Sequence, residues 1–249
     1  MKALITGASS GIGRDMAKIL SETGYDIYAV ARRADRLQEL KNELNTKVYP
    51  LVYDLSSKEQ CFELYEKLKD EDIDIVINNA GFGVCGKFSE IELDREIELI
   101  DTNITAVHIL TKHFYNQFKE KNKGKILNVA SSAGYMMGPL LATYYASKAY
   151  VLRLSQAINR ELIEDKSKVT VSVLCPGPVK TEFDKVANVK FSLSGLSSMY
   201  VAKCGIEGMF KGKSVIKPGV SIKLLLFFAR FIPDTILSKI TYNIQRKKV

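Results

Sequence analysis

Cysteine and histidine are scarce in this sequence. Its 249 residues include four cysteines and two histidines, and no two cysteines have the C-x-x-C spacing of zinc sites and redox motifs. We therefore expect no metal site, and we expect the four thiols to stay reduced, as in cytosolic proteins. The residues concerned are Cys61, Cys85, Cys175, Cys204, His108 and His113.

Long hydrophobic runs are also missing. The most apolar stretch, Ile222–Ile232, is too short to span a bilayer. The first expected strand begins at Lys2, which leaves no room for a signal peptide before it. These two observations together lead us to expect a cytoplasmic protein.

Acidic residues are nearly absent from the C-terminal part of the chain. From Lys211 to Val249 there are nine Lys and Arg residues and one acid, Asp234. The first 210 residues carry 27 basic and 27 acidic groups, so the net charge of +8 belongs to the tail. A neutral body without a recognised nucleic-acid-binding module argues against nucleic-acid binding. We therefore expect a catalytic domain at 1–217 and a basic, partly apolar extension at 218–249.

Short apolar segments alternate with amphipathic helical ones along most of the chain. The short segments are rich in Ile, Val and Leu, which is typical of strands buried on both faces. The alternation predicts an α/β fold of the Rossmann type, a single domain whose doubly wound parallel sheet of about seven strands has helices on both faces. Strands are expected at Lys2–Thr6, Asp26–Ala31, Lys47–Val52, Ile73–Ile77, Lys125–Ala130, Val169–Leu174 and Lys213–Lys217. Helices are expected at Gly11–Gly24, Ala34–Leu44, Lys58–Leu68, Leu93–Lys119 and Tyr144–Ile163.

A glycine-rich loop, Thr-Gly-Ala-Ser-Ser-Gly-Ile-Gly at residues 6–13, joins the first expected strand to the first expected helix. Glycines there allow a tight turn and a close approach to a pyrophosphate, whose charge the helix N-terminus stabilises. Glycine triplets also occur in ordinary turns, so the position between strand and helix carries the prediction. Contacts with a dinucleotide are expected from Gly7, Ser9, Ser10, Gly11, Ile12 and Gly13.

Two arginines, Arg32 and Arg33, follow the second expected strand. Enzymes that use NAD usually have an acid there, which binds the ribose 2′-hydroxyl. An acid would repel the 2′-phosphate of NADP, whereas guanidinium groups bind it through charge-assisted hydrogen bonds. The sequence therefore predicts NADP(H), with Arg32 ahead of Arg33 because it comes first after the strand. A merely solvated basic helix start is disfavoured, since Arg there opposes the helix dipole.

Tyr144 and Lys148 have the Y-x-x-x-K spacing, which places both on one face of a helix. A free phenol has a pKa of about 10, and a nearby ammonium group lowers it towards the range where a general acid–base works best. We expect Tyr144 to transfer a proton and Lys148 to lower its pKa. The spacing by itself is common on solvated helices, and Tyr145 does not have it.

These motifs, in this order, resemble those of the short-chain dehydrogenase/reductase family from about Lys2 to Lys217. The resemblance implies a catalytic serine thirteen residues before the tyrosine, at Ser131, to bind the substrate oxygen. It implies a fourth catalytic residue, Asn103, which would hold a water that relays protons to Lys148. It also implies cofactor contacts from Tyr144, Lys148, Asp54, Leu55, Asn79, Ala80, Gly81, Pro176, Gly177, Val179 and Thr181.

Four positions have alternative interpretations. Ser132 is one residue away from the serine position, and a local shift would exchange it with Ser131. Asn103 could be an ordinary helix residue bonded to the backbone, and Asn78, in the N-N-A-G motif, could tie strands together. Cys175 has no base beside it in sequence, so we interpret it as a small buried side chain.

The predicted reaction is hydride transfer between NADP(H) and a carbonyl or secondary alcohol, with reduction as the expected direction because cells keep NADPH reduced. Substrate loops are expected at 82–88, 135–143 and about 183–210, with Ser192–Met199 as a candidate lid. Their apolar side chains indicate an apolar or amphipathic ketone or keto ester, bound by Ser131, Tyr144 and Phe183. The alternatives are a 3-oxoacyl-(carrier or CoA) reductase and a non-catalytic NADP(H)-sensing or scaffold protein.

The C-terminal extension has three alternative roles. Its apolar run could pack on the body or a partner subunit, which we favour; it could lie on an anionic membrane; or it could receive an acidic acyl carrier protein. Arg246, Lys247 and Lys248 would assist the last two. The family resemblance implies a homodimer or homotetramer, with the 93–119 and 144–163 helices at an interface.

Overall fold

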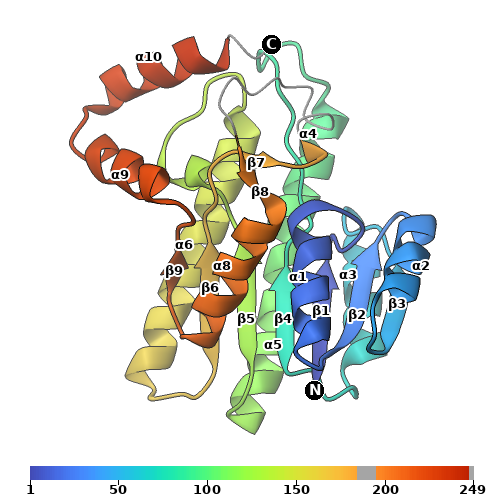
Figure 1. Cartoon of the computed structure of the whole chain (residues 1–249). Coiled ribbons are helices and arrows are strands. Elements are labelled where there is room, and N and C mark those ends of the chain that lie inside the picture. Colours follow the sequence, from blue (N-terminus) through green and yellow to red (C-terminus); the bar gives the residue numbers. More distant parts are fainter. Residues whose placement is uncertain (184–194, 247–249) are drawn as a thin grey trace.

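A seven-stranded parallel sheet forms the centre of the protein (Figure 1). The structure is a computed structural model that describes residues 1–183 and 195–246. The strand order β3-β2-β1-β4-β5-β6-β9 is that of a doubly wound Rossmann-type sheet, which confirms the predicted fold class. The strands are β1 (Lys2–Thr6), β2 (Asp26–Ala31), β3 (Val48–Val52), β4 (Ile75–Asn78), β5 (Lys125–Val129), β6 (Thr170–Leu174) and β9 (Val215–Ile216).

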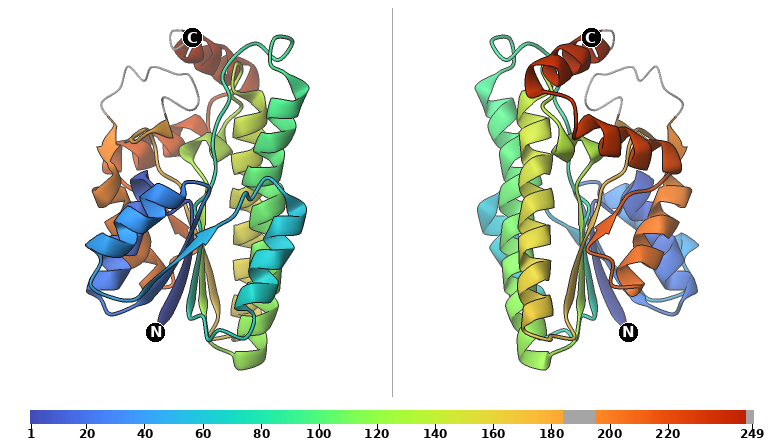
Figure 2. Two further views of the ribbon diagram at one scale, coloured as in Figure 1. Left: turned by 90° about the vertical axis from the view of Figure 1, so that its right-hand side faces the viewer. Right: turned by 90° about the vertical axis from the view of Figure 1, so that its left-hand side faces the viewer.

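Helices cover both faces of the sheet (Figure 2). Apolar side chains of α1 (Gly11–Glu22), α2 (Ala34–Glu43) and α8 (Ser198–Phe210) join one core cluster. Those of α3 (Lys58–Leu68), α5 (Ala106–Lys121) and α6 (Ala142–Glu164) join the opposite cluster. Within β1, Ala3 and Ile5 belong to the first cluster and Leu4 to the second. Because both faces are buried, the strands are almost continuously apolar, as the sequence indicated.

The region predicted as one helix from Leu93 to Lys119 is interrupted. It begins as α4 (Leu93–Ile100), passes through a π-helical turn, η1 (Asp101–Thr105), and continues as α5. Single π-helical turns widen a helix locally and are frequent at functional sites. Here the turn carries Asn103, whose side chain is fully buried.

The chain after β6 is more regular than the sequence indicated. A short strand, β7 (Val179–Lys180), pairs in parallel with β8 (Leu196–Ser197), and α8 follows at once. Of the proposed lid at 192–199, residues 192–194 lie outside the described residues, and Ser198 and Met199 begin α8. The extension forms two helices, α9 (Val220–Ala229) and α10 (Asp234–Gln245).

A buried polar network ties the sheet to the helices that cover one of its faces. Asn128 on β5 accepts hydrogen bonds from Asn78 Nδ2 at 2.8 Å and Thr111 Oγ1 at 3.2 Å, and donates one to Ser155 Oγ at 3.0 Å. The network joins β4 and β5 to α5 and α6. Asn78 on β4 is thus bonded to Asn128 on the neighbouring strand β5, as expected if its role is to tie strands together.

We predict that Asn128→Ala lowers the free energy of unfolding by about 2–4 kcal/mol, because it leaves three buried polar groups short of a partner. Urea denaturation followed by circular dichroism measures the difference. Asn42→Ala, on the exposed side of α2, is the matched control and is expected to change stability by less than about 0.5 kcal/mol. Equal stabilities for the two variants would show that the network does not hold the layers together.

Candidate active site

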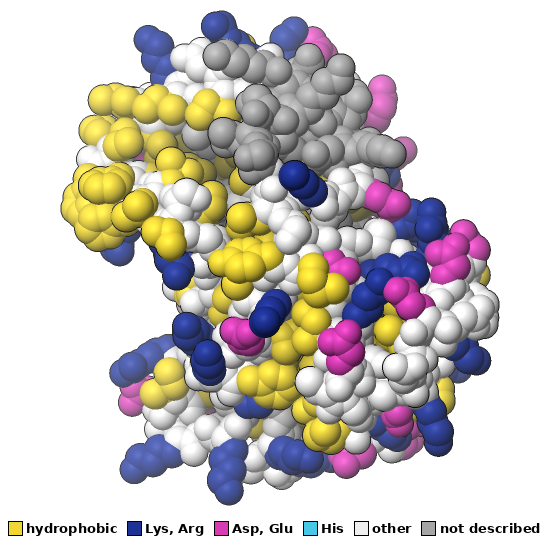
Figure 3. Space-filling view, viewed as in Figure 1, with side chains coloured by type: hydrophobic (Ala, Val, Ile, Leu, Met, Phe, Trp, Pro, Cys, Tyr) yellow, Lys and Arg dark blue, Asp and Glu magenta, His cyan; other side chains and the backbone are white. Residues whose placement is uncertain are grey.

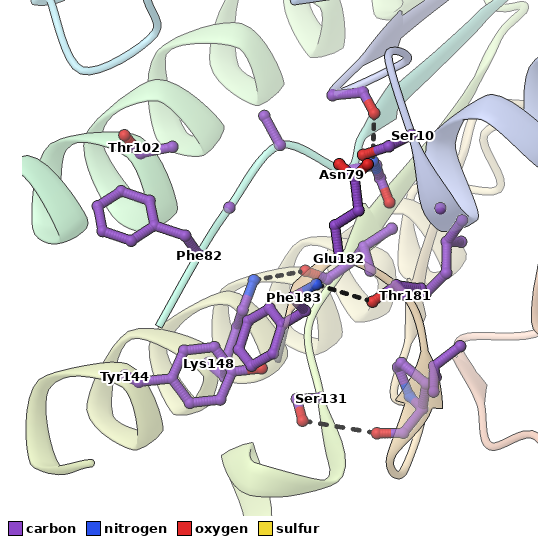
Figure 4. Close-up of a pocket in the computed structure, with 18 of the residues that line it drawn as sticks. Ser10, Asn79, Phe82, Thr102, Ser131, Tyr144, Lys148, Thr181, Glu182 and Phe183 are labelled. Carbon is purple, nitrogen blue, oxygen red and sulfur yellow. Dashed lines mark hydrogen bonds between the residues drawn. The ribbon is translucent and has the colours of Figure 1, made fainter. Parts of the chain in front are cut away.

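A cavity of about 520 Å³ lies at the carboxyl ends of the central strands (Figure 4). This is the edge where doubly wound sheets bind ligands. All but two of the predicted catalytic, cofactor-binding and substrate-binding residues line it; Gly13 and Asn103 do not. The predicted residues that line the cavity are Gly7, Ser9, Ser10, Gly11, Ile12, Arg32, Arg33, Asp54, Leu55, Asn79, Ala80, Gly81, Ser131, Tyr144, Lys148, Pro176, Gly177, Val179, Thr181 and Phe183.

The glycine loop is held against the end of β4 by Asn79. The Asn79 side chain donates to the carbonyl oxygens of Thr6 and Gly7, and Thr6 Oγ1 accepts the backbone N–H groups of Asn79 and Ala80 at 3.0 Å. A Cβ on Gly13 would stand 2.4 Å from both Asn79 Nδ2 and Gly7 O. Gly13 therefore allows helix α1 to pack on this loop, although it does not face the cavity.

The N-terminus of α1 points its free N–H groups at the same end of the cavity. Its N-cap residue, Ser10, makes no side-chain cap hydrogen bond, and its first turn contains no acidic residue. Unpaired N–H groups and the helix dipole favour an anion there. The loop and helix thus fit the pyrophosphate of a dinucleotide.

The two arginines after β2 point in different directions. The Arg33 guanidinium donates to Ser9 Oγ at 3.1 Å and to the Glu182 carboxylate at 2.9 Å. The Arg32 guanidinium instead pairs with Glu98 at 3.0 Å and lies 3.9 Å from Asp54. Arg33 is thus the arginine bonded to the glycine loop, whereas the sequence pattern favoured Arg32.

Asp54 lies at the end of the cavity near Arg32. Burial raises the pKa of its carboxyl, but hydrogen bonds from the backbone N–H and hydroxyl of Ser56, together with the charge of Arg32, reverse the effect and leave the pKa below its usual value. The carboxylate is therefore ionised at neutral pH and acts as a hydrogen-bond acceptor.

Ser131, Tyr144 and Lys148 converge at the opposite end of the cavity, as Figure 4 shows. The Tyr144 hydroxyl is hydrogen-bonded to Ser131, one of the two candidate serines. The Lys148 ammonium lies 5.9 Å from the centre of the Tyr144 ring and donates to the Val129 carbonyl oxygen at 3.1 Å. The α6 helix supplies tyrosine and lysine, and the chain just after β5 supplies the serine.

Burial dominates the titration of this pair. It raises the pKa of Tyr144 to about 12, although the hydrogen bond with Ser131 lowers it. It also lowers the pKa of Lys148 to about 8. The sequence led us to expect that the ammonium lowers the pKa of the phenol; in the structure burial of the phenol is the largest effect, and its pKa is raised.

Asn103 stands behind the cavity wall. Its amide exchanges two hydrogen bonds with the backbone of Phe82, at 3.0 and 2.9 Å, and donates a third to Ser147 Oγ at 3.0 Å. It therefore joins the loop after β4 to α6, which corresponds to the backbone-bonded alternative. A Cβ on Gly81 would lie 2.8 Å from Asn103 Oδ1 and 3.1 Å from Lys148 Nζ, so the missing side chain leaves room where these two groups approach.

The loop after β6 closes the cavity on a third side. The Pro176 carbonyl oxygen accepts the Ser132 N–H at 2.8 Å and the Ser131 hydroxyl at 3.5 Å, and Thr181 Oγ1 accepts the Phe183 N–H at 3.2 Å. The neighbouring Cys175 is fully buried, and burial raises the pKa of its thiol to about 12. Such a thiol stays protonated and is a poor nucleophile.

The cavity wall includes residues that the sequence analysis did not single out. Tyr145 is adjacent to the predicted Tyr144, and Glu182 lies in the loop after β6. Gln245 comes from α10, in the extension, and its amide donates to the Tyr145 hydroxyl one hundred residues away. No local sequence pattern predicts a contact between residues so far apart in the chain.

Comparison with known proteins identifies the family. A family model described as short chain dehydrogenase matches residues 1–190. An uncharacterized oxidoreductase of Schizosaccharomyces pombe is 35% identical over 181 residues, which are 72% of this chain but only 61% of that protein. An NADP-dependent 3-hydroxy acid dehydrogenase of the same yeast is 34% identical over 194 residues, covering 74% of this chain and 73% of that protein.

A solved structure points to the same family. The short-chain dehydrogenase from Sphingobium yanoikuyae in complex with NADPH superimposes with a TM-score of 0.83 at 29% identity, covering 92% of this chain and 93% of that chain. The chain therefore belongs to the short-chain dehydrogenase/reductase family. It falls among the oxidoreductases that act on alcohols and carbonyl compounds and bind a nicotinamide dinucleotide.

The burial of Lys148 leads to a prediction about how the stability of the fold depends on pH. Because folding lowers the pKa of Lys148 from its ordinary value of 10.5 to about 8, the unfolded chain binds the extra proton more readily, and below pH 8 the buried ammonium destabilises the fold by about 3 kcal/mol. The penalty disappears as the pH rises from 8 towards 10.5. Lys148→Met is therefore expected to be more stable than the natural chain at pH 7, with a gap that narrows above pH 8.

Urea unfolding at pH 7, 9 and 10 checks this expectation. Lys41→Met, at an exposed position of α2, controls for the loss of a lysine elsewhere. If Lys148→Met is less stable than the natural chain at pH 7, the ammonium is stabilised by its surroundings rather than penalised.

Proposed function

We propose that the chain is an NADPH-dependent carbonyl reductase that converts an apolar or amphipathic ketone or keto ester into a secondary alcohol. The observation that carries the proposal is the convergence of the Ser131, Tyr144 and Lys148 side chains at one end of a cavity whose other end is the glycine loop. A non-catalytic sensor would need the cofactor end alone.

The described residues fit the cofactor. The glycine loop and the N-terminus of α1 would hold the pyrophosphate, and Lys148 would hold the nicotinamide ribose. When bound, NADPH supplies the hydride. The Ser131 hydroxyl would donate a hydrogen bond to the substrate oxygen, and the Tyr144 hydroxyl would give that oxygen its proton. The ammonium of Lys148 would stabilise the phenolate that remains.

The state of Tyr144 favours reduction. A pKa raised to about 12 keeps its hydroxyl protonated at neutral pH, so the residue is a proton donor before the reaction begins. Oxidation of an alcohol would require the phenolate instead. The positive nicotinamide of the oxidised cofactor would favour that phenolate, which keeps the reverse reaction available at higher pH.

The cofactor end supports NADP(H) over NAD(H). Arg33 and Ser9 together present a cation and a hydroxyl beside the glycine loop, and Arg32 adds a second positive charge nearby. The Glu182 carboxylate now paired with Arg33 would give way to the more highly charged 2′-phosphate. The NADPH complex of the Sphingobium relative agrees with this assignment.

The substrate end is mostly apolar. Phe82, Leu141, Tyr145 and Phe183 line it, and the Tyr144 and Phe183 rings lie 5.3 Å apart. These side chains favour an apolar substituent on the carbonyl carbon. Part of the predicted third substrate loop, residues 184–194, lies outside the described residues.

Tyr144→Phe is expected to lower kcat for carbonyl reduction by about 10³-fold or more, because it removes the proton donor and little else. NADPH affinity, measured by fluorescence titration, is expected to change less than about threefold. Tyr145→Phe is the matched control at the adjacent position, and its kcat should stay within about tenfold of the natural chain. Full activity of Tyr144→Phe on a carbonyl panel would refute the mechanism.

Arg33→Ala is expected to raise the KM for NADPH by roughly 10- to 100-fold while changing the KM for NADH little, because the lost charge-assisted hydrogen bonds go to the 2′-phosphate. Arg32→Ala is expected to have a smaller effect in the same direction. Arg160→Ala, at the far end of α6, is the control. A natural chain that prefers NADH would overturn the assignment.

A further inference from the structure

The C-terminal helices carry a large exposed apolar surface. Eight side chains of Leu, Phe and Ile on and around α9 and α10 are between 43% and 73% exposed. We call them the α9–α10 surface. Hydrophobic side chains gather over these two helices in Figure 3, at the margin of the molecule where both helices project from the body in Figure 1. The members are Leu224, Leu225, Phe227, Phe228, Phe231, Ile236, Ile240 and Ile244.

These side chains are exposed although α9 and α10 both pack against the body of the protein. On α10 a stripe of Leu237, Thr241 and Gln245 is buried against the body, while Ile236, Ile240 and Ile244 repeat at the same four-residue interval on the adjoining, exposed side. On α9 only Leu226 is buried. The extension therefore has an inner face packed on the body and an outer face with many exposed apolar side chains.

The phenylalanines of this surface make a cluster of their own. The Phe227 ring lies 5.5 Å from that of Phe228 and 5.4 Å from that of Phe231. A monomeric protein rarely leaves such a contiguous apolar patch in water, so a partner is indicated. The surface consists of two projecting helices and not of a groove (Figure 1). Such a shape is better suited to insertion into a lipid bilayer than to binding a side chain of a partner protein.

The positive charge of the two helices indicates which partner this surface binds. Lys223, Arg230, Lys239 and Arg246 belong to the same two helices and the residues that end them, against one acid, Asp234. Two further lysines follow in sequence. A symmetric contact with a second copy would place two positively charged patches against each other, because such an interface uses the same patch on both sides. Anionic lipid headgroups around an apolar interior complement both properties at once.

We propose that the α9–α10 surface docks the protein on anionic membranes, with the phenylalanine cluster inserted among the acyl chains and the lysines and arginines at the headgroups. Docking would be peripheral: among the helices of residues 1–183 and 195–246, none is long and apolar enough to cross a bilayer. The proposal concerns binding alone and does not depend on the reaction assigned to the cavity.

Docking would have a consequence for the substrate, which does rest on the proposed function. Ile222 of α9 packs on Gly177, and Gln245 of α10 lines the cavity. The substrate end of the cavity would then lie next to the lipid surface, where apolar ketones and acyl compounds concentrate.

The test is flotation of the full-length protein with vesicles of phosphatidylcholine alone and of phosphatidylcholine with about a third phosphatidylglycerol. Binding is expected to the anionic vesicles, with at least about tenfold weaker partitioning to the neutral ones and a marked loss in high salt. Absence of binding to anionic vesicles would overturn the proposal, as would equal binding to both kinds.

Two variants assign binding to this surface. Phe227→Ser with Phe228→Ser and Phe231→Ser is expected to weaken vesicle binding at least about tenfold, and Lys223→Gln with Arg230→Gln to weaken it and reduce its salt dependence. Phe88→Ser, at a phenylalanine 70% exposed elsewhere, is the matched control. NADPH titration verifies that every variant is folded.

Light scattering and an acidic acyl carrier protein test the competing occupants. If the natural chain is an oligomer that the triple phenylalanine variant converts into a smaller species, with vesicle binding unchanged, the surface is a contact between copies and the proposal is wrong. The proposal is equally wrong if the carrier protein binds this surface while vesicles do not.

Discussion

Strand β1 lies at the middle of the sheet, paired in parallel with β2 on one side and with β4 on the other. The connection after β1 leads to the β2–β3 half of the sheet, and the later strands form the other half. At such a reversal of strand order, a crevice lies at the carboxyl ends of the strands. Thr6 and Asn79 link the two halves with four hydrogen bonds, which fix the glycine loop against the end of β4. The contacts proposed between the glycine loop and the pyrophosphate depend on that arrangement.

The reactive end of the cavity is built from groups that the fold would be more stable without. Lys148 is a buried ammonium that donates a hydrogen bond to a backbone carbonyl, and Tyr144 is a partly buried phenol whose pKa desolvation raises. An incompletely compensated cation favours any negative charge that develops beside it. The rigid supports, Asn103 with Phe82 and Ser147, and Asn128 with its three partners, keep these groups from relaxing towards solvent.

Much of this could be predicted from the sequence because it is encoded locally. The predicted strands and helices agree with the observed bounds to within two residues, apart from the interrupted 93–119 region. The i, i+4 spacing places Tyr144 and Lys148 on one helix face, and the family resemblance adds Ser131; all three side chains line the cavity. The π-helical turn at Asn103 was not foreseen, since a single such turn is too short to change the apolar periodicity of a long helix recognisably.

Other features depend on distances that sequence does not contain. Whether Arg32 or Arg33 faces the glycine loop depends on the direction in which α2 begins, and on Glu98 and Glu182 elsewhere in the chain. The pKa of Tyr144 follows from burial that several separate loops produce together. The contribution of Gln245 follows from the docking of α10 on the body, which no motif indicates.

Gln245 joins the extension to the catalytic end through one hydrogen bond, and within the described residues its buried Oε1 atom has no partner. A ligand that satisfied this atom would hold α10 more firmly in place. By thermodynamic reciprocity, whatever immobilises α10 from outside must then strengthen ligand binding by the same factor. The coupling free energy between ligand binding and attachment of α10 would then be the same in both directions, and Gln245 would be the residue that carries it.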